Sequence, residues 1–288
     1  MKKLSLAVLI ITLFTLFACQ KNTVTENDTE TSESIVEAEN AESDGFTFAL
    51  AGTDHQSKFG VLTSDSSNIT SCFTASFTIN SDGSITTVLT FNGTACPIDS
   101  IVRSGKIAIT WFPGWRLGLT NHDLIIKYEN FSRNGKVING TVSVHFERFD
   151  TTYVPLIGDT VVVPSFTFTA KDMSIKFQDG TTFSWNGTRK VSFLRGYYTP
   201  FDPRDNIVMI NANTSGTTRY GDSFTSVATN IIRVHRCPYH IPIAGVRTIN
   251  INNKETIIIN YGNGKCDPYY TITKNGKTVT VDVTKKNG

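Results

Sequence analysis

The sequence of 288 residues lacks the short patterns that mark several common enzyme classes. It has no Gly-x-Ser-x-Gly segment, the strand-to-helix turn that carries the serine of α/β-hydrolases. It has no glycine-rich phosphate loop leading into a helix, no two cysteines two to four residues apart, and no His-x-His pair. These absences argue against nucleotide and zinc chemistry. We predict no catalytic residue, no metal and no cofactor.

Helical periodicity is also missing, because no segment repeats apolar residues every three to four positions over an extended length. After Phe46, nearly every stretch is rich in Thr, Val, Ile, Phe and Tyr and alternates in polarity, which is typical of strands. Asn-Gly and Asp-Gly pairs separate these stretches and favour tight turns, so consecutive strands must be antiparallel. The expected strands are 71–80, 84–92, 104–112, 122–131, 137–149, 160–178 with a break at Pro164, 181–195, 206–212, 223–234, 245–252, 255–261, 269–274 and 277–284.

This pattern predicts an all-β fold over residues 46–288. We expect an antiparallel hairpin meander that forms an elongated sandwich or a long twisted sheet.

Long apolar runs are limited to the N-terminus. Lys2 and Lys3 precede an apolar run of 14 residues that ends at Phe17, and the small residue Ala18 follows. A permanent membrane span needs roughly 20 residues, so this run is too short. The layout is that of a secretory signal, and we predict that residues 1–18 are removed.

The segment Leu16-Phe17-Ala18-Cys19 resembles the lipobox of bacterial lipoproteins, whose cysteine is lipidated and becomes the first mature residue. The resemblance implies a membrane anchor at Cys19, whereas the alternative is an ordinary signal peptide with a chance cysteine. Gln20 stands where inner-membrane lipoproteins of well-studied bacteria carry aspartate, so the resemblance favours the outer membrane. Surface-exposed and periplasm-facing orientations both stay open.

Charge is divided unevenly along the chain. Residues 20–45 hold eight acids against one base, whereas the part from Phe46 onward has a formal charge of +7. A segment so poor in apolar residues cannot offset the entropy of ordering, so we predict a disordered acidic tether over residues 19–45. The positive domain could attract polyanionic glycans or anionic headgroups, although spread lysines that serve solubility give the same count.

The two ends of the predicted domain look alike. Residues 78–96 align without gaps to residues 248–266, with identical Thr-Ile-Asn starts and a shared final cysteine. We interpret the similarity as an internal duplication that covers residues 72–110 and 237–283.

The four remaining cysteines fit this duplication. If each copy folds about its own Asp-Gly or Asn-Asn turn, Cys72 lies close to Cys96, and Cys237 lies close to Cys266. We therefore predict these two disulfides, which an oxidising envelope permits, at the open ends of two similar hairpin units.

Four hairpin segments make the chain similar to a group of Bacteroidetes lipoproteins of unassigned function. The segments are 104–110, 134–141, 179–189 and 261–267. The resemblance implies an envelope lipoprotein, and it brings no activity with it.

Two aromatic stretches are the candidates for recognition. Trp111, Trp115 and Arg116 come from the first, and Tyr197 and Tyr198 from the second. Proline and glycine place both in loops, where an exposed ring can stack on a sugar. The alternative is that these rings cap the core.

The combined pattern predicts a non-enzymatic outer-membrane lipoprotein with a binding or structural role in the envelope. The expected partners are the membrane through Cys19 and an envelope glycan or another envelope protein, with no nucleic acid. One alternative is a glycan- or ester-hydrolysing enzyme on a β-scaffold, which for glycans needs two carboxylates about 5–10 Å apart in a cleft. Another is a carrier of apolar ligands, which needs an open barrel interior.

Overall fold

The described part of the chain forms one antiparallel sheet in which each strand pairs with its neighbours in sequence. The computed structural model describes residues 26–56, 72–97, 99–115, 121–199, 203–239, 241–252, 254 and 256–287. The strands are β1 (Phe73–Ile79), β2 (Ile85–Ala95), β3 (Val102–Trp111), β4 (Leu124–Arg133), β5 (Lys136–Val154), β6 (Asp159–Lys176), β7 (Thr182–Arg195), β8 (Ile207–Thr217), β9 (Ser223–Val234), β10 (Ala244–Ile251), β11 (Ile257–Asn263), β12 (Tyr269–Lys274) and β13 (Lys277–Asp282). Two short 3₁₀ turns, η3 (Pro203–Asp205) and η4 (Val283–Asn287), complete the described elements. The predicted all-β meander is confirmed as a single long sheet, not a sandwich.

Pro164 does not break β6, contrary to the sequence-based expectation. The pairing of β6 with β7 begins at Ser165, opposite Ser192. Pro164 lies just beyond this pairing and faces Phe149 of β5, so β6 has a partner on one side only at this point. A proline fits there because no neighbouring strand requires its missing N–H.

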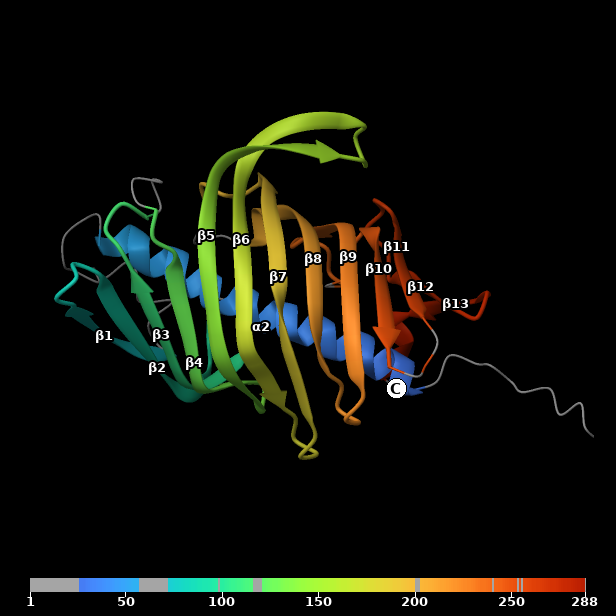
Figure 1. Cartoon of the computed structure of the whole chain (residues 1–288), viewed down its shortest axis with the longest axis horizontal. Helices are drawn as coiled ribbons and strands as arrows, with labels where there is room; N and C mark the ends of the chain where they lie inside the picture. Colours follow the sequence, from blue (N-terminus) through green and yellow to red (C-terminus); the bar gives the residue numbers. More distant parts are fainter. Residues whose placement is uncertain are drawn as a thin grey trace, which may run out of the picture.

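A long helix forms the second layer. Helix α2 (Glu26–Gln56) has 31 residues and runs across the strands on one face of the sheet (Figure 1). At 1.5 Å per residue it is about 46 Å long, against about 58 Å for twelve spacings between thirteen strands. Its C-terminal half packs Phe48 against Phe91 of β2, and Glu39 nearer its N-terminus pairs with Arg247 of β10. The helix therefore runs opposite to the strand order and spans most of the sheet.

The prediction of a disordered tether is wrong from Glu26 onward, and Cys19 lies outside the described residues. The folded unit begins in α2 and not at Phe46. Small or branched apolar side chains of the helix, among them Ile35 and Ala38, are buried against the sheet. The acids of the helix are also stabilised in the fold, because cations of the sheet lie opposite them.

Four carboxylates of α2 meet arginines from four separate strands, and we call this set the acid–arginine row. Its ion pairs are Glu37–Arg133 at 2.9 Å, Glu39–Arg247, Glu42–Arg189 at 3.1 Å and Asp44–Arg103 at 2.9 Å. The opposite charges seen in the sequence of the helix and of the sheet thus become one buried network.

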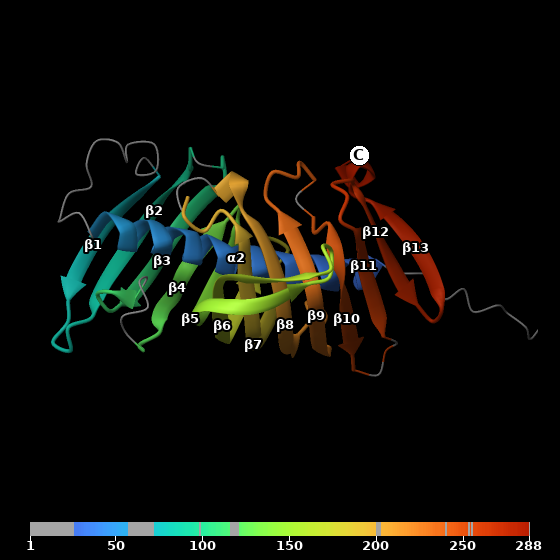
Figure 2. The same cartoon turned by 90° about the horizontal axis from the view of Figure 1, so that it is seen from above.

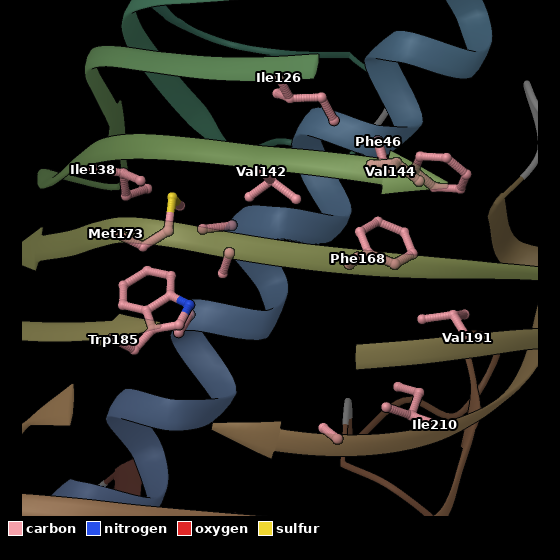
Figure 3. Packing of buried hydrophobic residues seen from close by; sticks show 14 of the residues in the cluster. Phe46, Ile126, Ile138, Val142, Val144, Phe168, Met173, Trp185, Val191 and Ile210 are labelled. Atoms are coloured by element: carbon pink, nitrogen blue, oxygen red, sulfur yellow. The ribbon is translucent and has the colours of Figure 1, made fainter. Parts of the chain in front are cut away.

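The centre of the core lies where Phe46 of α2 meets β4–β8 (Figure 3). The ring of Phe46 contacts Phe166 and Phe168 edge to face, with centroids 4.9 Å away in each case. Beside it, a Cβ on Gly45 would lie 2.1 Å from the Tyr128 hydroxyl, so glycine permits the close approach of helix and sheet. That hydroxyl donates to the carbonyl of Ala41 at 3.0 Å.

Both predicted disulfides, Cys72–Cys96 and Cys237–Cys266, are present near the ends of the sheet. The first joins the start of β1 to the end of β2. The second joins the segment after β9 to the segment after β11. Beyond the cysteines, Ser104-Gly105-Lys106 of the first unit resembles Asn275-Gly276-Lys277 of the second in sequence. The structural likeness stops there, because Gly105 lies inside β3 whereas Gly276 lies in the turn between β12 and β13.

Removal of the first disulfide should destabilise the fold measurably. The bridge closes a loop of 24 residues, and the chain-entropy model gives about 3–4 kcal/mol for such a loop. We expect the double variant Cys72→Ser, Cys96→Ser to lose this free energy of unfolding in urea. Added reductant should lower the stability of this variant further, because it breaks the remaining disulfide, Cys237–Cys266. An unchanged unfolding midpoint in the double variant would contradict the assignment.

A two-stranded arm extends from the sheet between Phe146 and Phe166, and we call it the β5–β6 arm. Its strands continue past the end of the β6–β7 pairing and close at a turn over residues 155–158. The arm bends over the sheet toward β10 and β11 (Figures 1 and 2). Its underside packs Val154 into a cluster with Met209 and Ile232, which fixes its position.

Candidate ligand-binding site

The aromatic residues expected to form an exposed recognition surface do not do so. Trp111, at the end of β3, is 6% exposed, and Trp115 is 1% exposed. Trp115 packs near the rings of Phe146 and Phe166, whose centroids are 6.3 and 6.0 Å away. The prediction is wrong for both tryptophans, because both are buried in the core, Trp115 at the base of the arm.

The second aromatic stretch has one buried and one exposed ring. Tyr197 is buried among Phe146, Phe166 and Phe193, whereas Tyr198 is 74% exposed. Arg116 lies outside the described residues. The described members of the predicted site therefore offer one exposed ring and no shared binding face.

A cavity of about 430 Å³ lies instead between the N-terminal half of α2 and the surrounding strands, and we call it the helix–sheet cavity. Its apolar lining is Val36, Phe177, Ile241, Pro242 and Val283. Its polar lining is Ser32, Glu33, Ser34, Glu37, Lys136, Arg219, Tyr261 and Tyr270. The volume is within the range of small-molecule sites.

Arg219 forms one wall of the cavity and is held in place on several sides. Its guanidinium lies over the ring of Phe177, 4.1 Å from the centroid. Its Nε donates to the Thr181 hydroxyl at 2.8 Å, and the same group pairs with Asp179 and with Glu30. The side chain is therefore oriented before any ligand arrives.

The charges that line the cavity are balanced. Glu37 accepts from Lys136 at 2.9 Å and from Arg133 at 2.9 Å, so both of its oxygens are bound. Glu33, one helical turn earlier, is exposed and marks the side open to solvent. The lining thus contains two carboxylates and two cations. Such a site has no net charge to attract a strongly ionic ligand.

Ser34 and Tyr270 bring two hydroxyl groups to the lining of the cavity. Ser34 is 1% exposed, and its Oγ has no hydrogen-bond partner although it lines the cavity. Burial raises the pKa of Tyr270 well above its ordinary value, and Glu33 adds to this rise, so the phenol stays protonated and can donate. A buried polar atom without a partner is costly, which makes a polar ligand the natural complement.

The same geometry argues against hydrolysis at this site. Glu33 and Glu37 are four residues apart on a helix, so their Cβ atoms are about 5–6 Å apart, near the spacing of a glycosidase pair. Both project from one helix, however, and do not flank a bond from two sides. Both oxygens of Glu37 are already bound, one by Lys136 and one by Arg133.

Sequence reasoning missed this cavity because its residues are spread from position 32 to position 283. Lys136 lies just after the turn between β4 and β5, and Arg219 lies in the turn between β8 and β9. The one usable signal was the concentration of acids before Phe46, set against a positive remainder. That signal indicates an intramolecular partner, but it does not say which arginine meets which acid.

Within the described ranges, no three His, Cys, Asp or Glu side chains gather as a metal site. In the same ranges, no helix is both long and apolar enough to cross a bilayer. Comparison of the chain with family models, curated proteins and solved structures finds no match. The function must therefore be argued from the site and from the N-terminal motif.

Proposed function

We propose that the chain is an outer-membrane lipoprotein, anchored through Cys19, whose folded part binds a neutral carbohydrate of the envelope in the helix–sheet cavity. The observation that carries the binding role is that Ser34, a residue of the cavity lining, has a buried hydroxyl without a hydrogen-bond partner. The anchor rests on the resemblance of residues 16–19 to a lipobox.

A polyhydroxylated ligand suits the lining in three respects. The balanced charges favour a neutral molecule, and the hydroxyls of Ser34 and Tyr270 can exchange hydrogen bonds with a sugar. The rings of Tyr261 and Tyr270 lie 6.0 Å apart and offer apolar faces to the C–H groups of a pyranose. A carrier of apolar ligands fits less well, because α2 covers the sheet face that such a ligand would occupy.

The test is glycan binding by the folded chain and by a double variant, Ser34→Ala, Tyr270→Phe. Two neutral hydrogen bonds are worth about 1–3 kcal/mol together, so we expect the Kd of a bound glycan to rise by about 5- to 150-fold. Binding can be screened on a glycan array and then measured by calorimetry. Release of shortened sugars in the same samples would instead support the hydrolase alternative.

The matched control is Tyr198→Phe, which removes a hydroxyl from an exposed ring that does not line the cavity. This variant should bind like the wild type. Equal affinities for all three proteins, or equal losses in both variants, would exclude the cavity as the binding site.

A further inference from the structure

The outward face of the β5–β6 arm carries apolar side chains that the fold does not bury. Phe149, Tyr153, Leu156, Ile157 and Val162 are between 43% and 64% exposed, and we call them the arm patch. Alternate residues of β5 point to one side, which places Phe149 and Tyr153 together. Val162 pairs with the residue between them, so the patch is continuous across both strands.

The arm holds this patch rigidly. Its other face buries Thr152, Val154 and Val163, and Val154 is part of a small core beneath the arm. At the tip, the Leu156 side chain comes so close to Gly264 that a Cβ there would lie 2.5 Å away. Leu156 apart, the patch residues take no part in this packing and stay exposed, which indicates a contact outside the chain.

The N-terminal part of the chain indicates what this contact is. Only six residues separate Cys19 from Glu26, and seven Cα steps reach at most about 25 Å. A lipid on Cys19 would hold the start of α2 that close to the bilayer. The N-terminal half of α2 lies toward β10, where Glu39 pairs with Arg247, and the arm tip reaches the same end of the sheet at Gly264 (Figures 1 and 2).

We propose that the arm patch docks on the surface of the bilayer that holds the lipid anchor. The proposal rests on the proposed lipidation of Cys19 but not on glycan binding. Aromatic and aliphatic side chains without charge suit the boundary between headgroups and acyl chains. None of the five patch residues is charged, so docking requires no anionic lipid.

The experiment uses the lipidated full chain carrying Ile157→Cys, reconstituted in phosphatidylcholine vesicles with brominated acyl chains. Cys19 is acylated and the other four cysteines form disulfides, so the new thiol takes a fluorescent label alone. We expect bromine to quench this label. A label at Ser76→Cys, on an exposed residue of β1 at the opposite end of the sheet, should not be quenched.

A second variant tests the patch itself. Phe149→Ser with Tyr153→Ser, added to the labelled Ile157→Cys chain, should reduce the quenching several-fold while the unfolding midpoint stays unchanged. Absent quenching at position 157, or equal quenching at positions 157 and 76, overturns the proposal. The label could instead be shielded from solvent to a degree that depends on the density of protein in the vesicles and not on the lipid. That result would identify a second copy of the chain as the occupant of the patch and would also overturn the proposal.

Measuring the mass of the mature chain shows whether Cys19 carries lipid, so a failure of the docking proposal can be told from a failure of the proposed anchor. A lipidated chain without quenching refutes the docking alone. A chain without lipid on Cys19 refutes both.

Discussion

Glu39→Gln is expected to cost about 3–5 kcal/mol of the free energy of unfolding, because it leaves buried arginines without a compensating charge. Burial alone would raise the pKa of Glu39, but the charges of Arg247, Arg233 and Arg189 outweigh it and lower the pKa. Arg247 is itself fully buried. Urea unfolding at neutral pH measures the loss, which is a large part of the 5–15 kcal/mol typical of a domain.

Glu42→Gln is the matched control, one helical turn away in the same acid–arginine row. Burial raises the pKa of Glu42, and Arg189 and the Trp185 N–H, which donates at 2.8 Å, only partly offset this rise. The glutamine side chain can still accept the bond from Trp185. We expect a clearly smaller loss than for Glu39→Gln, and equal losses would show that the two carboxylates are equivalent.

The two positions should also respond to pH in opposite directions. The lowered pKa of Glu39 means that its stabilisation is complete above its ordinary pKa and is lost as pH falls through the folded value. The raised pKa of Glu42 means that its protonated form is favoured in the folded state, so its contribution grows on acidification. Between about pH 7 and about pH 3, the advantage of the wild type should shrink relative to Glu39→Gln and grow relative to Glu42→Gln.

Phe46→Ala should destabilise the fold by about 3–5 kcal/mol through the cavity that it leaves. The Phe46 ring contacts Phe166, Phe168 and Phe193 at the centre of the interface between α2 and the sheet. No other layer covers this face of the described sheet, so no further side chains are available to fill the space that the Phe46 ring leaves. Urea unfolding measures the loss, provided that the dependence of the unfolding free energy on urea concentration is the same in both proteins.

The same substitution at Phe149, an exposed ring of the β5–β6 arm, is the control for Phe46→Ala. It should change the stability by no more than about 0.5 kcal/mol. Similar losses for both variants would mean that α2 does not pack on the sheet as described.

The strands were predictable because their signals are local. Asn134-Gly135, Asp179-Gly180 and Asn275-Gly276 turn the chain where the sequence predicted, and Asn134 and Asn275 adopt the positive φ that such turns require. The disulfides followed from two further predicted turns, Asp82-Gly83 and Asn252-Asn253, because a hairpin turn fixes which residues lie opposite each other.

The helix was not predictable from the same kind of signal. Nine of its 31 residues are apolar and four of these are alanines, which gives a weak helical pattern. The burial of its acids is compensated only by arginines that lie far along the chain. The tryptophans failed for a related reason, because Pro113 and Gly114 do mark a bend, but nothing local decides whether Trp115 then points outward or folds back onto the core.

The position of α2 in the chain has a consequence for how the protein matures. The helix is the first described element, yet its ion-pair partners follow much later in the chain. Arg103, the partner of Asp44, comes 59 residues later, and Arg247, the partner of Glu39, comes 208 residues later. Contacts over such separations form slowly. A chain crossing a membrane from its N-terminus would deliver the helix long before the strands that bury it. If the chain is exported and acylated as proposed, both steps would act on an unfolded polypeptide, and folding would finish only after the last hairpins had crossed.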